Sequence, residues 1–250
     1  AKTEHGIDPN TTLMVSAARS AKYRTMHGVT FADIHAPVLD QHPEASLLIV
    51  GSGQRDDWAP VLERMGGRLR GLPEQPNPKI YFEAADIYVD SYPFVSSTSL
   101  MEAAGYGLPL VTIFTAPEAA RIFGINHVAL VGNTMQATSF EQYRGILSGL
   151  IRDPALRNRL GQAANDAVRR EHNLPGWSRY VSEVVKHANG RIRHWEVWNE
   201  PPNGTRRDQT PADYAKIVVS AYDAAKAADP ECLIGMAAKS VHVNYLEQVI

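Results

Sequence analysis

Short apolar runs alternate with amphipathic stretches along most of the chain. The runs are too short to be typical helices, and each is followed by turn residues. This pattern is typical of strands that are buried on both faces of a parallel sheet. We therefore expect strands at residues 11–17, 46–50, 87–89, 108–114 and 127–131.

Amphipathic helices are predicted between and after these strands, because apolar residues recur there at intervals of three and four. Strands that alternate with helices predict an open, doubly wound, Rossmann-like α/β sheet. Helices are expected from about residues 31, 56, 99, 117, 138 and 154, and over the stripe that contains Trp177, Tyr180, Val181 and Val184.

The pattern changes around residues 188–190, where Asn189-Gly190 is a turn signal. A strand, a polar loop, a helix capped by Thr210 and another strand follow. We therefore predict two domains, residues 1–188 and 189–250. The elements of the second domain are expected at residues 192–198, 202–209, 210–228 and 232–237.

Composition narrows the classes of function. The net charge is −2 and the pI is about 6.5, which gives no electrostatic footprint for nucleic acid or an anionic membrane. No apolar run approaches the length of a membrane span, and no secretory signal follows Ala1. The single cysteine, Cys232, fits a reducing compartment, so a cytoplasmic location is expected. The nine histidines show no metal-ligand spacing, and no metal is expected.

Segments after three of the predicted strands carry chemistry suited to a phosphorylated ligand, which binds at the carboxyl edge of an open α/β sheet. The first strand leads into a segment that contains the cations Arg19, Lys22 and Arg24, which can neutralise a diphosphate. The second strand ends at Gly51 and Gly53, where missing side chains let a ligand approach the backbone.

The predicted strand at residues 87–89 ends at Asp90 and leads into a turn rich in serine and threonine that opens a helix. The free N–H groups and the dipole of such a helix start favour phosphate, and Glu102 is placed to accept hydrogen bonds from a ribose diol. Each feature alone also fits an ordinary turn, a solvated loop or a carboxylate stabilised by the helix dipole. Their common position at one sheet edge favours a nucleotide site.

Residues 11–187 resemble the nucleotide-binding C-terminal domain of GT-B glycosyltransferases. The resemblance is carried by the order of the segments and by residues 85–112, ADIYVDSYPFVSSTSLMEAAGYGLPLVT, which are similar to the donor-binding region of that superfamily. It implies that Glu102 holds the ribose and that Arg19 and Lys22 contact the diphosphate, with a spacing close to that in O-linked N-acetylglucosamine transferases. The phosphates are implied to lie along Ser96, Ser97, Thr98 and Ser99.

The resemblance implies metal-independent transfer of a hexose from a nucleotide-diphosphate sugar to a carbohydrate or protein acceptor. Phe94 stands where many retaining members carry a second glutamate, and the histidine that often precedes the paired threonines of O-linked transferases is absent, so the sugar and the stereochemistry stay open. The superfamily's N-terminal domain, which supplies most acceptor contacts, is also missing and is expected as a partner. A non-catalytic module that binds nucleotide or glycan is an alternative.

The second domain contains the block HWEVWNEP at residues 194–201. Glu200 falls at the carboxyl end of a predicted strand, where (β/α)₈ barrel enzymes keep their catalytic residues. The block resembles the acid/base strand of retaining glycoside hydrolases, which implies that Glu200 is the acid/base and that Asn199 binds the sugar 2-hydroxyl. Retention needs a second carboxylate about 5 Å away, and two strands cannot close a barrel. We therefore expect a partial (β/α) barrel segment, with glycoside hydrolysis as the other alternative function.

Overall fold

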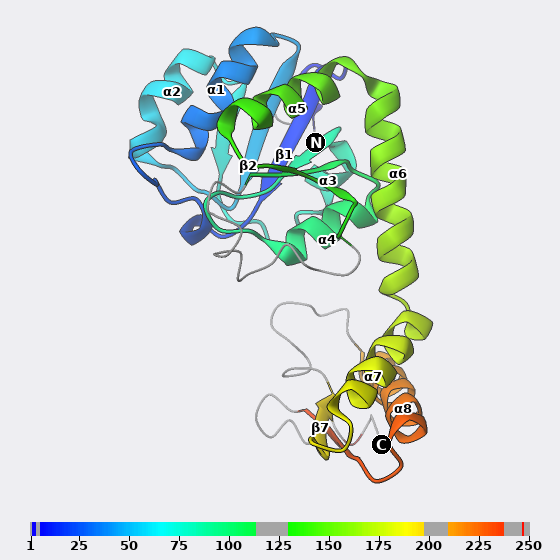
Figure 1. The fold of residues 1–250 in the computed structure, drawn as a ribbon. Coiled ribbons are helices and arrows are strands. Elements are labelled where there is room, and N and C mark those ends of the chain that lie inside the picture. The colour runs from blue at the N-terminus through cyan, green and yellow to red at the C-terminus, as the bar shows by residue number, and fades with distance from the viewer. Residues whose placement is uncertain (1, 4–5, 114–129, 198–209, 238–246, 248–250) are drawn as a thin grey trace. The chain divides into compact units, whose positions relative to one another are not determined.

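A computed structural model describes residues 2–3, 6–113, 130–197, 210–237 and 247 of the chain (Figure 1). The chain divides into two compact units, Ala1–Arg169 and Arg170–Ile250. The division lies before the turn at Asn189-Gly190, because the helix that precedes this turn packs within the second unit.

The first unit contains one six-stranded, wholly parallel sheet with the strand order β3-β2-β1-β4-β5-β6. The order along the chain reverses between β1 and β4, which is the topological switch point of a doubly wound sheet. The predicted Rossmann-like architecture is therefore confirmed for this unit. The strands are β1 Thr12–Ala17, β2 Ala45–Val50, β3 Leu69–Leu72, β4 Ile87–Val89, β5 Leu110–Ile113 and β6 Thr134–Ala137.

The two edge strands of the sheet differ from the sequence prediction. No strand is predicted at β3, because Arg70 and Gly71 interrupt its apolar pattern. The prediction of a strand at residues 127–131 is wrong for residues 130 and 131, because residues 130–133 form a turn and β6 follows them. Residues 127–129 lie outside the described residues. Edge strands are only partly covered, so neither needs the continuous apolar run that marks the central strands.

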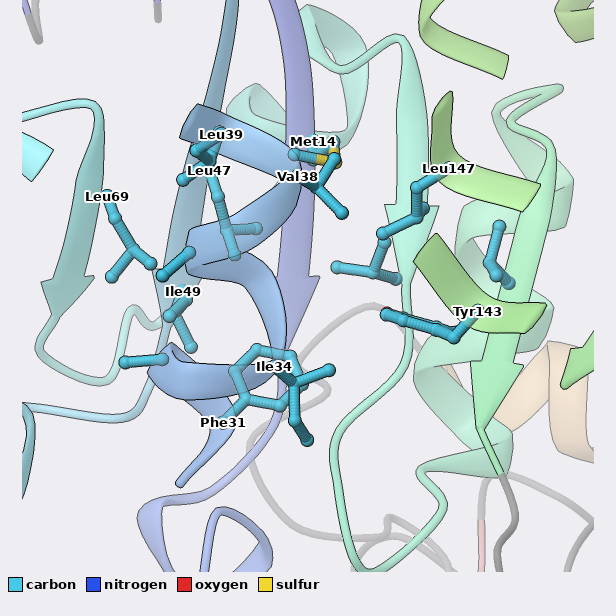
Figure 2. Close-up of a cluster of buried hydrophobic side chains, with 14 of the residues drawn as sticks. Met14, Phe31, Ile34, Val38, Leu39, Leu47, Ile49, Leu69, Tyr143 and Leu147 are labelled. Atoms are coloured by element: carbon cyan, nitrogen blue, oxygen red, sulfur yellow. The ribbon is translucent and has the colours of Figure 1, made fainter. Parts of the chain in front are cut away.

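Helices cover both faces of the sheet, and successive residues of β1 alternate between two hydrophobic cores. Met14 belongs to the first core, whereas Leu13 and Val15 belong to the second. Figure 2 shows part of the first core, where α1 lies across the central strands. The first core includes α1 Phe31–Gln41, α2 Ala59–Met65 and α5 Phe140–Arg152, and the second includes α3 Lys79–Ala84, α4 Ser97–Gly105 and α6 Pro154–Glu171.

The second unit is a parallel β-α-β motif with an additional helix. Its elements are α7 Leu174–Ala188, β7 His194–Val197, α8 Pro211–Ala228 and β8 Leu233–Met236. Helix α7 packs on α8, where the indole N–H of Trp177 donates to the carbonyl of Ile217 at 3.1 Å. The buried hydroxyl of Tyr214 donates to the carbonyl of Val197 at 2.9 Å and accepts from the amide of Ala237 at 2.9 Å, which ties α8 to the ends of both strands.

Candidate functional site

The candidate site lies at the carboxyl edge of the first sheet, at the switch point between β1 and β4. Parallel strands bring their carboxyl ends to the same edge, so loops that are distant in sequence meet there. We name them the β1 loop (residues 18–25), the β2 loop (residues 51–58) and the β4 loop (residues 90–96). Helix α4 begins directly after the β4 loop.

The β1 loop brings one of the two predicted phosphate ligands across the switch point. The ammonium of Lys22 is partly buried and donates a hydrogen bond of 2.5 Å to the carbonyl of Val95 in the β4 loop. Arg19 lies three residues earlier, is exposed and precedes a 3₁₀ turn, Ser20–Lys22. The structure therefore places Lys22 in direct contact with the β4 loop, whereas a role for Arg19 at this edge stays a prediction.

Gly51 is required by the close approach of the β1 and β2 loops. Its φ is +88°, and a Cβ at this position would lie 2.3 Å from the carbonyl oxygen of Ala18. Its amide donates to the carbonyl of Leu72 at 3.0 Å, which ties the β2 loop to β3 as well. Packing of the backbone thus accounts for this glycine, and contact with a ligand stays a prediction.

Polar contacts of Arg55 and Asp57, which the sequence analysis missed, join the β2 loop to the β1 loop. The guanidinium of Arg55 donates to the carboxylate of Asp57 at 3.1 and 3.2 Å and lies 5.1 Å from the centroid of the Trp58 ring. The hydroxyl of Thr25 donates to the same carboxylate at 2.7 Å. Arg55 also reaches the carbonyl of Ser20 at 3.5 Å. These contacts hold the cation-bearing segment against its neighbour.

A buried carboxylate lies beneath the β4 loop. Asp90 directly follows β4 and is only 1% exposed. The amide of Ser96 donates to its two oxygens at 3.0 and 3.2 Å. Burial raises the pKa of Asp90 to about 7, whereas hydrogen bonds from Ser96 and Ser91 and the charge of Lys22 act in the opposite direction. The sequence pattern identified Asp90 as the end of a strand, but its burial and its partners emerge from the tertiary structure.

The first turn of α4 presents the hydroxyl groups that were predicted to line the phosphates. Ser96 is buried and its hydroxyl lies 3.0 Å from that of Ser99, whereas Thr98 is exposed and Ser97 is partly buried. Glu102 is partly buried on the same helix. The predicted serines, threonine and glutamate thus lie on α4 and its N-cap, directly after the β4 loop.

The remaining predicted site residues belong to the second domain. Glu200 and Asn199 lie outside the described residues. Phe94, which stands at the position of the expected second glutamate, is 53% exposed in the β4 loop. Within the described ranges, no group of three or more His, Cys, Asp or Glu side chains is arranged to hold a metal ion. No helix there combines the length and the apolar character that a membrane span requires.

Comparison with known proteins supports the fold of the first unit. No protein-family model matches the sequence, and no curated protein matches it either. A mutant O-GlcNAc transferase from Thermobaculum terrenum superposes with a TM-score of 0.50 at 22% identity, over 65% of this chain and 32% of its own. WaaG, a glycosyltransferase involved in lipopolysaccharide biosynthesis, superposes with a TM-score of 0.53 at 18% identity, over 67% and 45%. TarM gives 0.52 at 13% identity, over 69% and 34%.

This chain spans less than half the length of each of these three structures. At such identities the likeness shows the fold alone, which is a parallel, Rossmann-like α/β sheet. The resemblance of residues 190–250 to glycoside hydrolases stays a prediction.

Proposed function

We propose that the first unit is the donor-binding half of a glycosyltransferase that uses a nucleotide-diphosphate sugar. The observation that carries the proposal is the meeting of two anion-binding features at the switch point of a GT-B-like sheet. The β1 loop supplies Arg19 and Lys22, and the start of α4 supplies N–H groups and the hydroxyls of residues 96–99. Open α/β sheets bind their ligands at this place.

Charge complementarity favours a diphosphate in this crevice. Lys22 contacts Val95 just before α4, Arg19 lies three residues before Lys22, and the dipole of the helix start adds partial positive charge. During transfer of the hexose, negative charge grows on the leaving diphosphate, and cations in fixed positions stabilise it there. We therefore propose that Arg19 and Lys22 perform this task without a metal ion. The acceptor, a carbohydrate or a protein, is proposed to bind mainly through an N-terminal partner domain.

Glu102 provides the test of the nucleotide site. We expect Glu102→Ala to weaken binding of the preferred nucleotide by at least about tenfold, because it removes hydrogen bonds between a carboxylate and the ribose diol. Calorimetric titration of the chain with UDP, GDP and ADP identifies the preferred base, and the variant is then titrated with that nucleotide. Glu63→Ala, which removes an exposed helical carboxylate on α2, is the matched control and should bind normally. Equal affinities for both variants would reject the ribose role.

Two other functions are kept as proposals. The β7-α8-β8 motif is a parallel β-α-β unit of the kind that barrels contain, which favours a glycosidase segment as the second candidate. Hydrolysis of aryl glycosides by this segment after completion to an eight-stranded barrel, abolished in Glu200→Gln, would support it, and Asn199 is its proposed 2-hydroxyl ligand. Saturable nucleotide binding without transfer, even after addition of an N-terminal domain, would instead support a non-catalytic binding module.

A further inference from the structure

Asp90 is a buried carboxylate that has no assigned role in ligand contact. Its side chain is 1% exposed at the end of a central strand. Burying a carboxylate is costly unless hydrogen bonds or a cation compensate. The position of its compensating partners therefore indicates what the residue does.

The hydrogen-bond partners of Asp90 lie at the two ends of the β4 loop. At the far end, the amide of Ser96 donates to both carboxylate oxygens at 3.0 and 3.2 Å. At the near end, the backbone amide of Ser91 also donates to it. Ser91 additionally donates its hydroxyl to the carbonyl of Phe94 at 2.6 Å. The carboxylate thus closes the loop that ends where α4 begins.

Lys22 is the cation that contacts the β4 loop beside Ser96, the partner of Asp90. Its charge lowers the pKa of that carboxyl, while its ammonium donates to the carbonyl of Val95, next to Ser96. Within the described ranges, the charge of Asp90 acts on tyrosines from three elements, and burial, followed by this charge, raises the pKa of each. They are Tyr23 of the β1 loop, Tyr88 of β4 and Tyr143 of α5.

We infer that Asp90 is a positioning residue that couples the two halves of the anion site. It holds the β4 loop at the start of α4 and thereby keeps the Val95 carbonyl in place to accept from the Lys22 ammonium. The nucleotide part of this inference rests on the proposed function, whereas the coupling between the loop and Lys22 does not. If Asp90 only stabilised the fold as a whole, its replacement would lower the free energy of unfolding without a local change at the β4 loop and Lys22.

Hydrogen exchange without any nucleotide tests the coupling. We expect Asp90→Ala to raise the exchange rate of the amides at residues 91–99 by at least about tenfold, because the acceptor of Ser96 N–H is removed. Asp90→Asn keeps an amide oxygen at this place and should stay much closer to the wild type. Asp86→Ala is the matched control, since Asp86 accepts from the amide of Leu13 and from Lys2 at the opposite end of β4.

The same variants are then titrated with the nucleotide that the wild-type chain binds. We expect about a tenfold loss of affinity for Asp90→Ala, at most about a threefold loss for Asp90→Asn, and none for Asp86→Ala. Lys22→Met leaves Asp90 in place and should also loosen the amides near Val95, which keeps the test decisive if Asp90→Ala fails to fold.

The inference would be overturned if the amides of residues 91–99 exchanged as slowly in Asp90→Ala as in the wild type. If only Lys22→Met folds, wild-type exchange rates in that variant would overturn it instead. Local loosening in these variants, together with no nucleotide binding by the wild-type chain, would reject the proposed function and leave the coupling of loop and lysine in place.

Discussion

Replacing Gly51 with alanine is expected to destabilise the first unit by about 4 kcal/mol, as the sum of left-handed backbone strain and overpacking. The φ of Gly51 is +88°, and its new Cβ would lie 2.3 Å from the carbonyl oxygen and 3.1 Å from the carbonyl carbon of Ala18. Neither backbone can yield easily, because Ala18 donates to the carbonyl of Val50 at 3.1 Å and Gly51 donates to that of Leu72 at 3.0 Å. Urea denaturation of the whole chain, followed by circular dichroism, measures the loss.

Gly53→Ala is the matched control for Gly51→Ala. Gly53 also has a left-handed conformation, with a φ of +66°, but a Cβ at this position would meet no atom within 4 Å. This variant should therefore lose only the conformational part, about 1 kcal/mol. Equal losses for the two variants would mean that contact with Ala18 is not what requires a glycine at position 51. The test matters for the site, because Ala18 directly precedes Arg19.

The central part of the fold follows from local sequence patterns. Strands β1 and β2 are buried along their whole length, so each is a continuous apolar run that is legible without a structure. The edge strands β3 and β6 are partly exposed, and their sequences, LRGL and TMQA, carry no such signal. The predicted parallel sheet brings the carboxyl ends of its strands to one edge, which is why the candidate site could be proposed there from the sequence.

The internal organisation of the site could not be predicted in the same way. Nothing in the sequence near Asp90 shows that it is buried or that its partner Ser96 folds back onto it, because burial is a property of the assembled layers. The contact between Lys22 and Val95 joins residues that are 73 positions apart. The contacts of Arg55 and Asp57 with the β1 loop also join residues that are distant in sequence. The residue types at the carboxyl edge can be read from the sequence, whereas their contacts with one another are known only from the folded structure.

The pH dependence of stability offers a second large effect, because two buried groups of the first unit titrate in opposite directions. His35 is fully buried, and burial lowers its pKa from 6.5 to about 4. One ring nitrogen lies 2.8 Å from the carbonyl of Phe31, which must accept, so the other accepts from the hydroxyl of Tyr143 at 3.0 Å. This arrangement holds the neutral ring. Burial also raises the pKa of Asp90 from 3.8 to about 7, which favours the neutral acid.

The sign of each contribution follows from which state binds more protons. Between about pH 4 and 6.5 the unfolded chain protonates His35 and the folded chain does not, so acidification removes about 3 kcal/mol of stability. Between pH 3.8 and about 7 the folded chain keeps the proton of Asp90 and the unfolded chain releases it, so a rise in pH removes about 4 kcal/mol. The two effects oppose each other over most of the same window.

We therefore expect each single variant to show a pH dependence of its free energy of unfolding that largely cancels in the wild-type chain. Asp90→Asn leaves the His35 contribution, so its free energy of unfolding should fall from pH 7 to pH 4. His35→Gln leaves the Asp90 contribution, so its free energy of unfolding should fall from pH 4 to pH 7. Urea denaturation at pH 4, 5.5 and 7 gives the slopes, and each variant is compared only with itself, so the fixed cost of the substitution cancels. Slopes of the same sign in both variants would contradict the assignment of these protons, because removing a group can only remove its own linkage.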